Sequence, residues 1–371
     1  MRTGQLERST PLLEDVGHRA EVLGRDALTL ACASHLSVAR LMSGALPGAR
    51  QQAERALEVA ARRGWWRTEK AMPAHLVLAW TGYLQADREL AGRHAGVAGT
   101  TTGAATDPRL LQSLDSCSVL IGLEAGPEPH RLLTRYLAGL REEVLAQMTP
   151  TSHAHAGPLL VQAALRIGGA SAAAEVARSH TRPREAPAEQ LLQQALLRHA
   201  HGDPAGALAA LAPILDGEAK HPVQVTLATA QLLSADLYLQ RGAELRAHQA
   251  LREALSIAGP TELLRPFVDA SSAVQELLRD DLDRLARTEG FAARVITRFG
   301  RADHPGAIPT LTPAEARVLR ELPSRLTVLE IATPKGVSAN TVKTQLHALY
   351  RKLGVSGRRE AVEVARRHGL L

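Results

Sequence analysis

Aromatic and cysteine side chains are scarce in this sequence of 371 residues. Phe, Trp and Tyr together make up 3% of it, and the two cysteines are Cys32 and Cys117. Two isolated thiols form neither a disulfide framework nor a metal knuckle, which indicates a reducing compartment. No apolar run is long enough to cross a bilayer, and the first ten residues lack the apolar segment of an export signal. We therefore expect a cytoplasmic protein without a membrane segment.

The motifs of common enzyme and cofactor sites are also missing. No G-x-x-x-x-G-K-[ST] sequence is present, so no P-loop is predicted to hold a nucleotide. His153 and His155 are two residues apart, as are His199 and His201, and side chains at that spacing diverge on a helix. Because no third ligand is near either pair, we expect surface histidines rather than a metal site. The sequence predicts no enzymatic activity, no cofactor and no metal.

What the sequence does contain is mostly Ala, Leu, Arg and Glu, residues that lose little conformational freedom in helices. An all-α fold is therefore predicted. Pairs of amphipathic segments occur at 26–63, 188–215 and 225–260, and units recur at roughly 35–40 residues, the spacing of tetratricopeptide-like repeats. We expect such a helical-repeat domain over residues 1–299; an irregular helical bundle is the alternative.

Turn residues and apolar faces give these pairs their detail. The sequence HGDP (201–204) and Gly242 are predicted to separate the helices of the two later pairs. Trp65 and Trp66 follow Gly64 at a helix end, where they either cap the core of a repeat or stack on a ligand. In the first pair, the expected buried residues are Leu28, Ala31, Cys32, Leu36 and Ala39 of the first helix and Ala53, Ala56, Leu57 and Ala60 of the second.

Positive charge is concentrated at the end of the chain. Residues 311–371, called the head below, contain 11 Lys+Arg and 5 Asp+Glu, a net charge of +6, whereas the other 310 residues contain 33 of each. A basic unit beside a neutral one is the charge distribution expected of a nucleic-acid-binding domain. The Gly- and Pro-rich stretch at 300–310 is the predicted linker between them.

The head is predicted to begin with two capped helices. Thr312 and Glu315 form one expected capping box, with Pro313 at the first helical position, and Thr327 and Glu330 form the second. Gly336 then turns the chain. The residues expected to be buried on these helices are Val318, Leu319, Leu322, Leu329 and either Ile331 or Ala332.

The helix predicted over residues 339–353 divides into an apolar and a polar face. Val342, Leu346, Leu349 and Leu353 recur at steps of four, three and four residues, which places them in one stripe. A recognition helix needs such an anchor so that its other face can enter the major groove, where Asn, Lys and Thr can contact bases. The residues on that opposite side are Asn340, Lys343, Thr344, His347 and Arg351. An ordinary solvated face is the alternative interpretation.

The run VSANTVKTQLHALYRKLGVSGRREAV, residues 337–362, resembles the LuxR-type (GerE) DNA-binding domain. The resemblance implies a four-helix domain that binds double-stranded DNA, often as a dimer through its last helix, and that recruits or regulates RNA polymerase. It implies that Lys343, Thr344 and His347 face bases. Thr341 and Lys352 match positions near the phosphates, and Gln345 stands where the family commonly has His. The resemblance also places Arg358 and Arg359 at the start of the fourth helix.

The segment EALSIAGPTELLRPFVDASSAVQELL, residues 253–278, resembles the helical-repeat part of large regulators similar to the maltose-regulon activator. Those proteins carry an ATP-hydrolysing module, which is not found in these 371 residues, so control by ATP is not carried over. Pro334 and Lys335 depart from the family's pattern. Proline removes a helical hydrogen bond, so we expect the helix that begins after Thr327 to be shortened to about residue 333.

These observations predict a transcription regulator in three parts. Residues 1–299 would form the repeat domain that binds a small-molecule or protein effector, residues 300–310 the linker, and residues 311–371 the DNA-binding domain, with a homodimer as the expected assembly. The alternative is a protein-interaction scaffold whose degenerate head no longer binds DNA. The predicted DNA-binding residues are Asn340, Thr341, Lys343, Thr344, Gln345, His347, Arg351 and Lys352.

Overall fold

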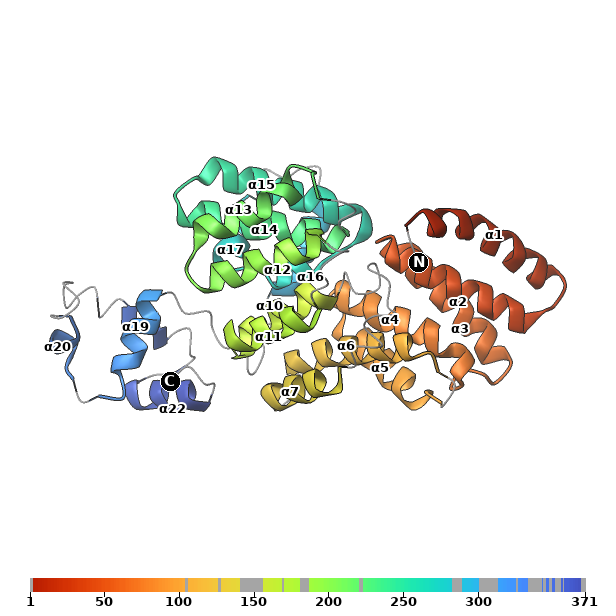
Figure 1. Cartoon of the computed structure of the whole chain (residues 1–371), viewed down its shortest axis with the longest axis horizontal. Coiled ribbons are helices and arrows are strands. Elements are labelled where there is room, and N and C mark those ends of the chain that lie inside the picture. The colour runs from red at the N-terminus through yellow and green to blue at the C-terminus, as the bar shows by residue number, and fades with distance from the viewer. Residues whose placement is uncertain are drawn as a thin grey trace. The chain divides into compact units, whose positions relative to one another are not determined.

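The computed structural model confirms the all-α class, because every element that it describes is a helix (Figure 1). The structure describes residues 3–103, 106–125, 128–140, 156–168, 170–180, 187–219, 223–281, 289–299, 313–324, 326–332, 342, 345, 346, 349, 350, 355 and 357–367.

Two compact units make up the chain. Unit 1 comprises Met1–Leu165 and Gly169–Asp303, and unit 2 comprises His304–Leu371 with Arg166–Gly168. The predicted linker at 300–310 lies outside the described residues. Each unit is therefore considered separately.

Helical hairpins build unit 1, and several neighbours in sequence pack against each other: α1 with α2, α2 with α3, α4 with α5, α12 with α13, and α14 with α15 (Figure 1). This arrangement agrees with the predicted helical repeats. The helices are α1 (Thr3–Val22), α2 (Asp26–Met42), α3 (Leu46–Arg62), α4 (Met72–Leu84), α5 (Arg88–Thr100), α6 (Pro108–Ala125), α7 (Pro129–Gly139), α10 (Ala156–Gly168), α11 (Ala170–His180), α12 (Pro187–Ala200), α13 (Pro204–Leu215), α14 (Gln224–Gln240), α15 (Glu244–Ala258), α16 (Arg265–Val268), α17 (Ser272–Asp280) and α18 (Glu289–Phe299), with 3-10 turns η1 (Glu69–Ala71) and η2 (Gly259–Thr261).

The predicted turns between hairpin helices are present. Gly202 lies just after the end of α12 and Gly242 just after the end of α14, and both have the positive φ, 77° and 69°, that favours glycine after a helix. Asp203 then caps α13, because its carboxylate accepts a hydrogen bond of 2.8 Å from the backbone N–H of Gly206. Local sequence chemistry therefore sets where these hairpins turn.

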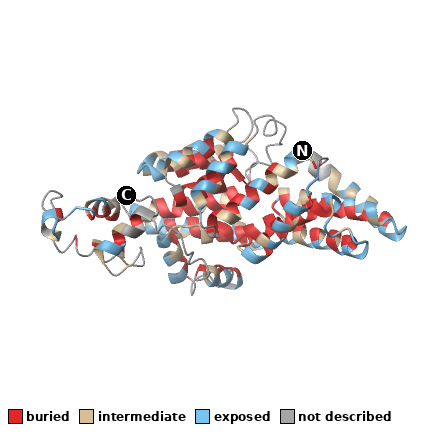
Figure 2. Ribbon diagram, turned by 90° about the horizontal axis from the view of Figure 1, so that it is seen from below, coloured by how far each residue is buried: buried red, intermediate tan, exposed pale blue. Residues whose placement is uncertain are grey.

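The predicted buried face of α3 is confirmed, and small residues dominate it. Ala53, Ala56, Leu57 and Ala60 of α3 are all buried. At Gly82, where α4 crosses α5, a Cβ atom would come within 2.7 Å of the backbone nitrogen of Ala91. Figure 2 shows the buried residues gathered between adjacent helices, with exposed residues on their outer sides. The close approach of the helix backbones depends on the missing side-chain volume.

The predicted face of α2 is partly wrong. Cys32, Leu36 and Ala39 are buried, but Leu28 is 46% exposed and Ala31 is also exposed. The reason is that α2 packs against both α1 and α3, so its buried arc is wide and is centred away from these two positions. Leu30 supplies the buried leucine of the first turn instead.

A buried ionic cluster joins helices that are far apart in sequence. The guanidinium of Arg265 in α16 pairs with Glu124 of α6 and lies 3.5 Å from Oδ1 of Asp269. Its Nε donates a hydrogen bond of 3.1 Å to the carbonyl of Tyr83 in α4, and the group lies 4.2 Å from the centre of the Tyr83 ring. Arg265 therefore ties the last part of the repeat region to α4 and α6.

Candidate nucleic-acid interface

The first helix of the head, α19 (Pro313–Glu321), has the buried face that its sequence predicts. Val318, Leu319 and Leu322 are each exposed by 3% or less. Thr312, the expected cap, lies outside the described residues, so the first capping box stays a prediction. Helix α19 ends before Pro323, as expected for a residue that cannot continue a helix.

The second predicted capping box is confirmed at the start of α20 (Val328–Ala332). The carboxylate of Glu330 accepts a hydrogen bond of 2.7 Å from the backbone N–H of Thr327, and the N–H of Glu330 donates one of 3.4 Å to the Thr327 hydroxyl. These hydrogen bonds from Thr327 lower the pKa of the Glu330 carboxyl. Ile331 and Ala332 are both buried. The cap fixes where this helix begins and turns its apolar residues into the core.

The apolar anchor of the predicted recognition helix is present. Residues 342, 345, 346, 349 and 350 are helical, and Val342, Leu346 and Leu349 are buried at 0%, 8% and 0% exposure. They belong to a core with residues of α19, α20 and α22 (Arg358–Arg367). Packing thus holds one side of this helix in the domain.

Of the eight predicted DNA-binding residues, the structure places Gln345, which is half-buried at the edge of this anchor. The others lie outside the described residues, and so do Leu353, Pro334 and Lys335. The expected shortening of α20 and the predicted base and phosphate contacts therefore stay predictions. The residues in question are Asn340, Thr341, Lys343, Thr344, His347, Arg351 and Lys352.

Arg358 has a structural role that the sequence did not reveal. From the first turn of α22, its guanidinium donates hydrogen bonds to the carbonyls of Leu322 (3.0 Å), Ser324 (2.7 Å), Leu326 (2.6 Å) and Glu321 (3.3 Å). These carbonyls belong to the end of α19 and to the connection that leads to α20. Arg358 therefore fixes the connection between the first two helices of the head. Nothing in the sequence distinguishes it from the neighbouring Arg359.

The candidate histidine pairs show no metal site within the described residues, where no group of three or more His, Cys, Asp or Glu is placed to hold a metal ion. His153 and His155 lie outside those residues. Nε2 of His199 lies 3.3 Å from the carboxylate of Asp236, so this histidine has a protein partner. His201 bonds through Nδ1 to the carbonyl of Leu197 at 2.7 Å.

A buried histidine pair, His75 and His94, lies beside Trp66 in unit 1. Nε2 of His75 is 2.9 Å from the carbonyl oxygen of Trp66, which can only accept, so the His75 proton is on Nε2. Its Nδ1 then accepts from Nδ1–H of His94 at 2.8 Å. Burial lowers the pKa of His94 to about 4, helped by charge repulsion from His75, Arg93 and Arg50, and burial also lowers the pKa of His75. Both rings are therefore neutral at pH 7.

The tryptophans beside this pair contact protein groups. The ring of Trp66 meets His75 edge-on, with 4.8 Å between ring centres, and is 38% exposed. Trp65 is half-buried, and Nζ of Lys70 lies 4.5 Å from the centre of its ring. These contacts agree with tryptophans that cover the end of a helical hairpin.

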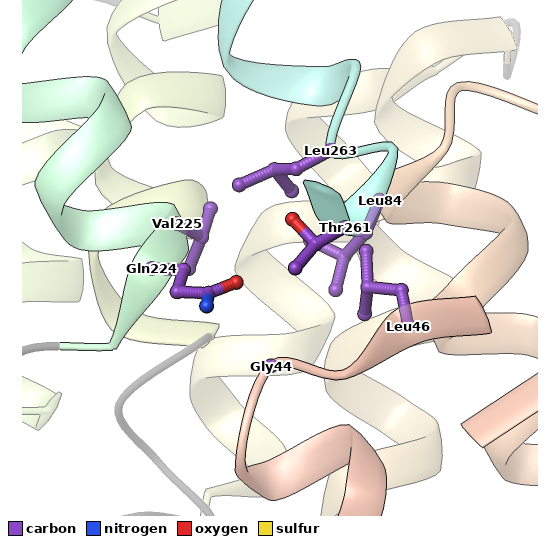
Figure 3. Close-up of a pocket in the computed structure, with 7 residues that line it drawn as sticks. All are labelled: Gly44, Leu46, Leu84, Gln224, Val225, Thr261 and Leu263. Atoms are coloured by element: carbon purple, nitrogen blue, oxygen red, sulfur yellow. The ribbon is translucent and has the colours of Figure 1, made fainter. Parts of the chain in front are cut away.

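A small cavity opens where four segments of unit 1 meet (Figure 3). Its volume is about 220 Å³, part of it open to solvent. Because this figure includes open solvent, the enclosed space is far smaller than the roughly 300–1,000 Å³ of pockets that hold drug-sized ligands, so the cavity gives no basis for assigning an effector. Its lining residues are Gly44, Leu46, Leu84, Gln224, Val225, Thr261 and Leu263.

No helix in the described part of the chain is long and apolar enough to span a membrane.

The geometry of the head defines a class. Two short helices, the second of them capped, a helix anchored by Val342, Leu346 and Leu349, and a closing helix fixed through Arg358 form a small helix-turn-helix domain. Residues 309–365 match the family model described as bacterial regulatory proteins, luxR family. The C-terminal unit is a LuxR-family (GerE) helix-turn-helix domain, as its sequence predicts.

The chain is also similar to larger regulators. It is 34% identical over 159 residues to the HTH-type transcriptional regulator MalT of Serratia proteamaculans (strain 568), and 33% identical over 159 residues to that of Klebsiella pneumoniae (strain 342). Each match covers 36% of this chain and 18% of the regulator. The MalT of Yersinia pestis (strain Pestoides F) is 33% identical over 161 residues, which cover 37% and 18%. The chain thus spans less than a fifth of the length of these relatives.

Proposed function

We propose that this protein is a DNA-binding transcription regulator in which a helical-repeat domain controls a LuxR-type head. The repeat domain is assigned to residues 1–299, the linker to 300–310 and the DNA-binding domain to 311–371. The observation that carries this proposal is the buried anchor of Val342, Leu346 and Leu349 in the head, residues 311–371, which carries a net charge of +6. An anchored helix in a basic domain is suited to enter the major groove.

Individual roles are proposed from the resemblance to the LuxR-type domain. Lys343, Thr344 and His347 are proposed to face bases, where Lys can donate to guanine and Thr can contact a thymine methyl. Thr341 and Lys352 are proposed to contact phosphates, which position the domain without reading sequence. Asn340, Gln345 and Arg351 complete the proposed surface, and the half-buried Gln345 marks its inner edge.

The remaining partners are proposed at the level of their class. The relatives are named as transcriptional regulators, which supports an action on RNA polymerase at a promoter. A small molecule or a protein bound to the repeats would act as effector by changing the exposure or pairing of the heads, and the chain would act as a homodimer in the cytoplasm. No catalytic step is part of the proposal.

DNA binding is tested with the full chain and duplexes selected from a random library, measured by fluorescence anisotropy. Binding through phosphates should weaken linearly in log affinity as log salt rises. Lys343→Ala and His347→Ala should each reduce the preference for the selected duplex over a scrambled one by about tenfold, the loss of one base contact. Arg320→Ala is the control, since it removes one positive charge from an exposed position on α19.

Two results would contradict the proposal. A chain that does not bind any duplex at low salt would favour a scaffold whose head has lost DNA affinity. An unchanged sequence preference in both Lys343→Ala and His347→Ala would place the base-reading surface elsewhere in the head.

A further inference from the structure

Helix α1 has an exposed side that no described part of the chain covers. Leu12 is 64% exposed and Val22 is 72% exposed, and the side chains of Asp15 and Arg19 between them are 52% and 73% exposed. The opposite side, which includes the buried Ala20, packs against α2 (Figure 1). This first hairpin thus leaves apolar and charged side chains together in solvent.

The four residues form one stripe. Leu12, Asp15, Arg19 and Val22 follow each other at steps of three, four and three residues, the spacing of a coiled-coil seam. We call them the α1 stripe. Leu23 and Leu28, 71% and 46% exposed, extend the apolar surface beyond its end. Of the seven large apolar side chains exposed in the described residues, four therefore lie in this first hairpin. Isolated exposed leucines are ordinary, but Leu12 and Val22 lie on one face with a charged pair between them, and more exposed leucines follow in the same hairpin, which favours a helix partner.

The order of residues in the stripe identifies the partner. Its two ends are apolar, and its centre holds one acid and one base that already form an ion pair at 3.0 Å. If a second α1 helix lies antiparallel, centred on the same point, Leu12 comes opposite Val22 of the second copy. Asp15 then comes opposite Arg19 of the second copy, and the same two contacts repeat on the other side of the two-fold axis. The stripe is complementary to itself, as an isologous interface requires.

We propose that the α1 stripe is a self-association surface through which two copies of this chain pair by antiparallel packing of their α1 helices. An unrelated partner would need no acid and base at symmetric positions, so the charge pattern favours a second copy. One helix pair buries less than the roughly 1,200 Å² of stable complexes, so the dissociation constant is expected in the micromolar range. The pairing belongs to unit 1 and does not depend on DNA binding by the head.

Charge reversal tests the pairing in the full chain without DNA, by sedimentation velocity from 1 to about 200 μM protein. Asp15→Arg places four positive charges at the centre of the pair, and Arg19→Asp places four negative charges there. Each variant is expected to raise the dissociation constant at least tenfold. The double variant Asp15→Arg/Arg19→Asp keeps the pattern complementary and should pair like the wild type.

Mixing the two single variants is the decisive arm. In an antiparallel pair, position 15 of one chain lies opposite position 19 of the other. The Asp15→Arg chain has arginine at both positions and the Arg19→Asp chain has aspartate at both, so opposite charges meet at each contact. The equimolar mixture should therefore associate although neither variant does so alone. Glu58→Arg makes the same charge change as Asp15→Arg on an exposed position of α3 and should leave association unchanged. Far-ultraviolet circular dichroism checks that all variants are folded.

Three outcomes overturn the proposal. The wild-type chain could be monomeric over the whole range, which would assign the stripe to another protein or to nothing. Association could persist unchanged in Asp15→Arg, which would place the dimer contact on another surface such as the head. The mixture of single variants could stay monomeric, which would exclude the antiparallel register.

Discussion

At the scale of single residues, Arg358 joins α22 to the connection between α19 and α20. One guanidinium satisfies four carbonyls at the end of α19 and in the connection that follows. The carbonyl of Glu321 also accepts from the backbone N–H of Ser324 at 3.1 Å, but shortening Arg358 would remove the charged donor from all four carbonyls. A hydrogen bond to a charged group is worth about 1.5–3 kcal/mol. Lysine, a single ammonium, cannot reproduce the planar fork.

Arg358→Ala should therefore destabilise the head by about 2 kcal/mol, with Arg358→Lys between it and the wild type. Hydrogen exchange measures this locally, because amides of α19 and α22 should exchange about 30-fold faster while those of α4 and α14 do not change. Arg320→Ala, an equal loss of charge on exposed α19, should leave the exchange of α22 as it is. Equal effects of the two alanine variants would refute the bracing role of Arg358.

The buried pair His75–His94 gives a pH dependence with a definite sign. The pKa of His94 is about 4 in the folded chain, against about 6.5 when unfolded. Between these values the unfolded chain binds a proton that the folded chain does not. The contribution of neutral His94 to the free energy of unfolding is therefore fully present above pH 6.5. It is lost at up to about 1.4 kcal/mol per pH unit as the pH falls toward 4.

His94→Gln removes this titration and keeps an N–H that can donate to Nδ1 of His75. The free energy of unfolding, from urea titrations at pH 7 and pH 5, should fall less in this variant than in the wild type. The prediction fails if both proteins lose the same stability between the two pH values.

At the scale of helices, the distance between α4 and α5 depends on the lack of a side chain at Gly82. A Cβ atom there would lie 2.7 Å from the nitrogen of Ala91 and 3.1 Å from the carbonyl oxygen of Asp87. Gly82→Ala must push the two backbones apart, and we expect a loss of about 1–3 kcal/mol. Gly96 on α5 is exposed, with nothing within 4 Å of its Cβ position. Gly96→Ala should instead add about 0.5–1 kcal/mol, since alanine favours helices. Urea denaturation distinguishes these opposite signs, and a loss in both variants would contradict the account.

Helix positions were predictable where turn chemistry and periodicity agree. Gly202 and Gly242 mark where helices end. Asp203, and Thr327 with Glu330, mark where helices begin. Each of these signals is visible in the sequence because it acts within a few residues. Helix α1 was not predicted: Pro11 lies inside it and its exposed side mixes leucine with charge. The face of α2 was misplaced at Leu28 because the position of α1 against it is a tertiary property.

In the candidate site, too, features set by nearby residues were predictable and features set by tertiary contacts were not. The anchor of Val342, Leu346 and Leu349 could be predicted, since burial follows a spacing that is visible in the sequence. The contribution of Arg358 could not, because its four acceptors are 32–37 residues away in the chain and become neighbours only in the fold. Neighbouring Arg359 has the same side chain and sits one position further along α22.

At the scale of the whole molecule, charge and assembly are divided between the two units. The head carries the net charge of +6, while the remaining 310 residues are neutral overall and include the α1 stripe. If two chains pair through α1, their two heads are held together even where the heads themselves do not touch. A duplex with two half-sites would then bind the second head at a high effective concentration.

If pairing through α1 links two heads, breaking that pairing should weaken binding to a duplex with two half-sites and leave binding to a duplex with one half-site unchanged. At micromolar protein, the wild type should bind a duplex with two selected half-sites at least tenfold more tightly than a duplex with one, provided that their spacing suits the linked heads. Asp15→Arg should reduce this ratio toward one while leaving the single-half-site affinity unchanged, because Asp15 belongs to unit 1. The double variant Asp15→Arg/Arg19→Asp should restore the ratio. If instead the ratio survives in Asp15→Arg, the heads pair on DNA by themselves, and α1 does not contribute to the choice between single and double sites.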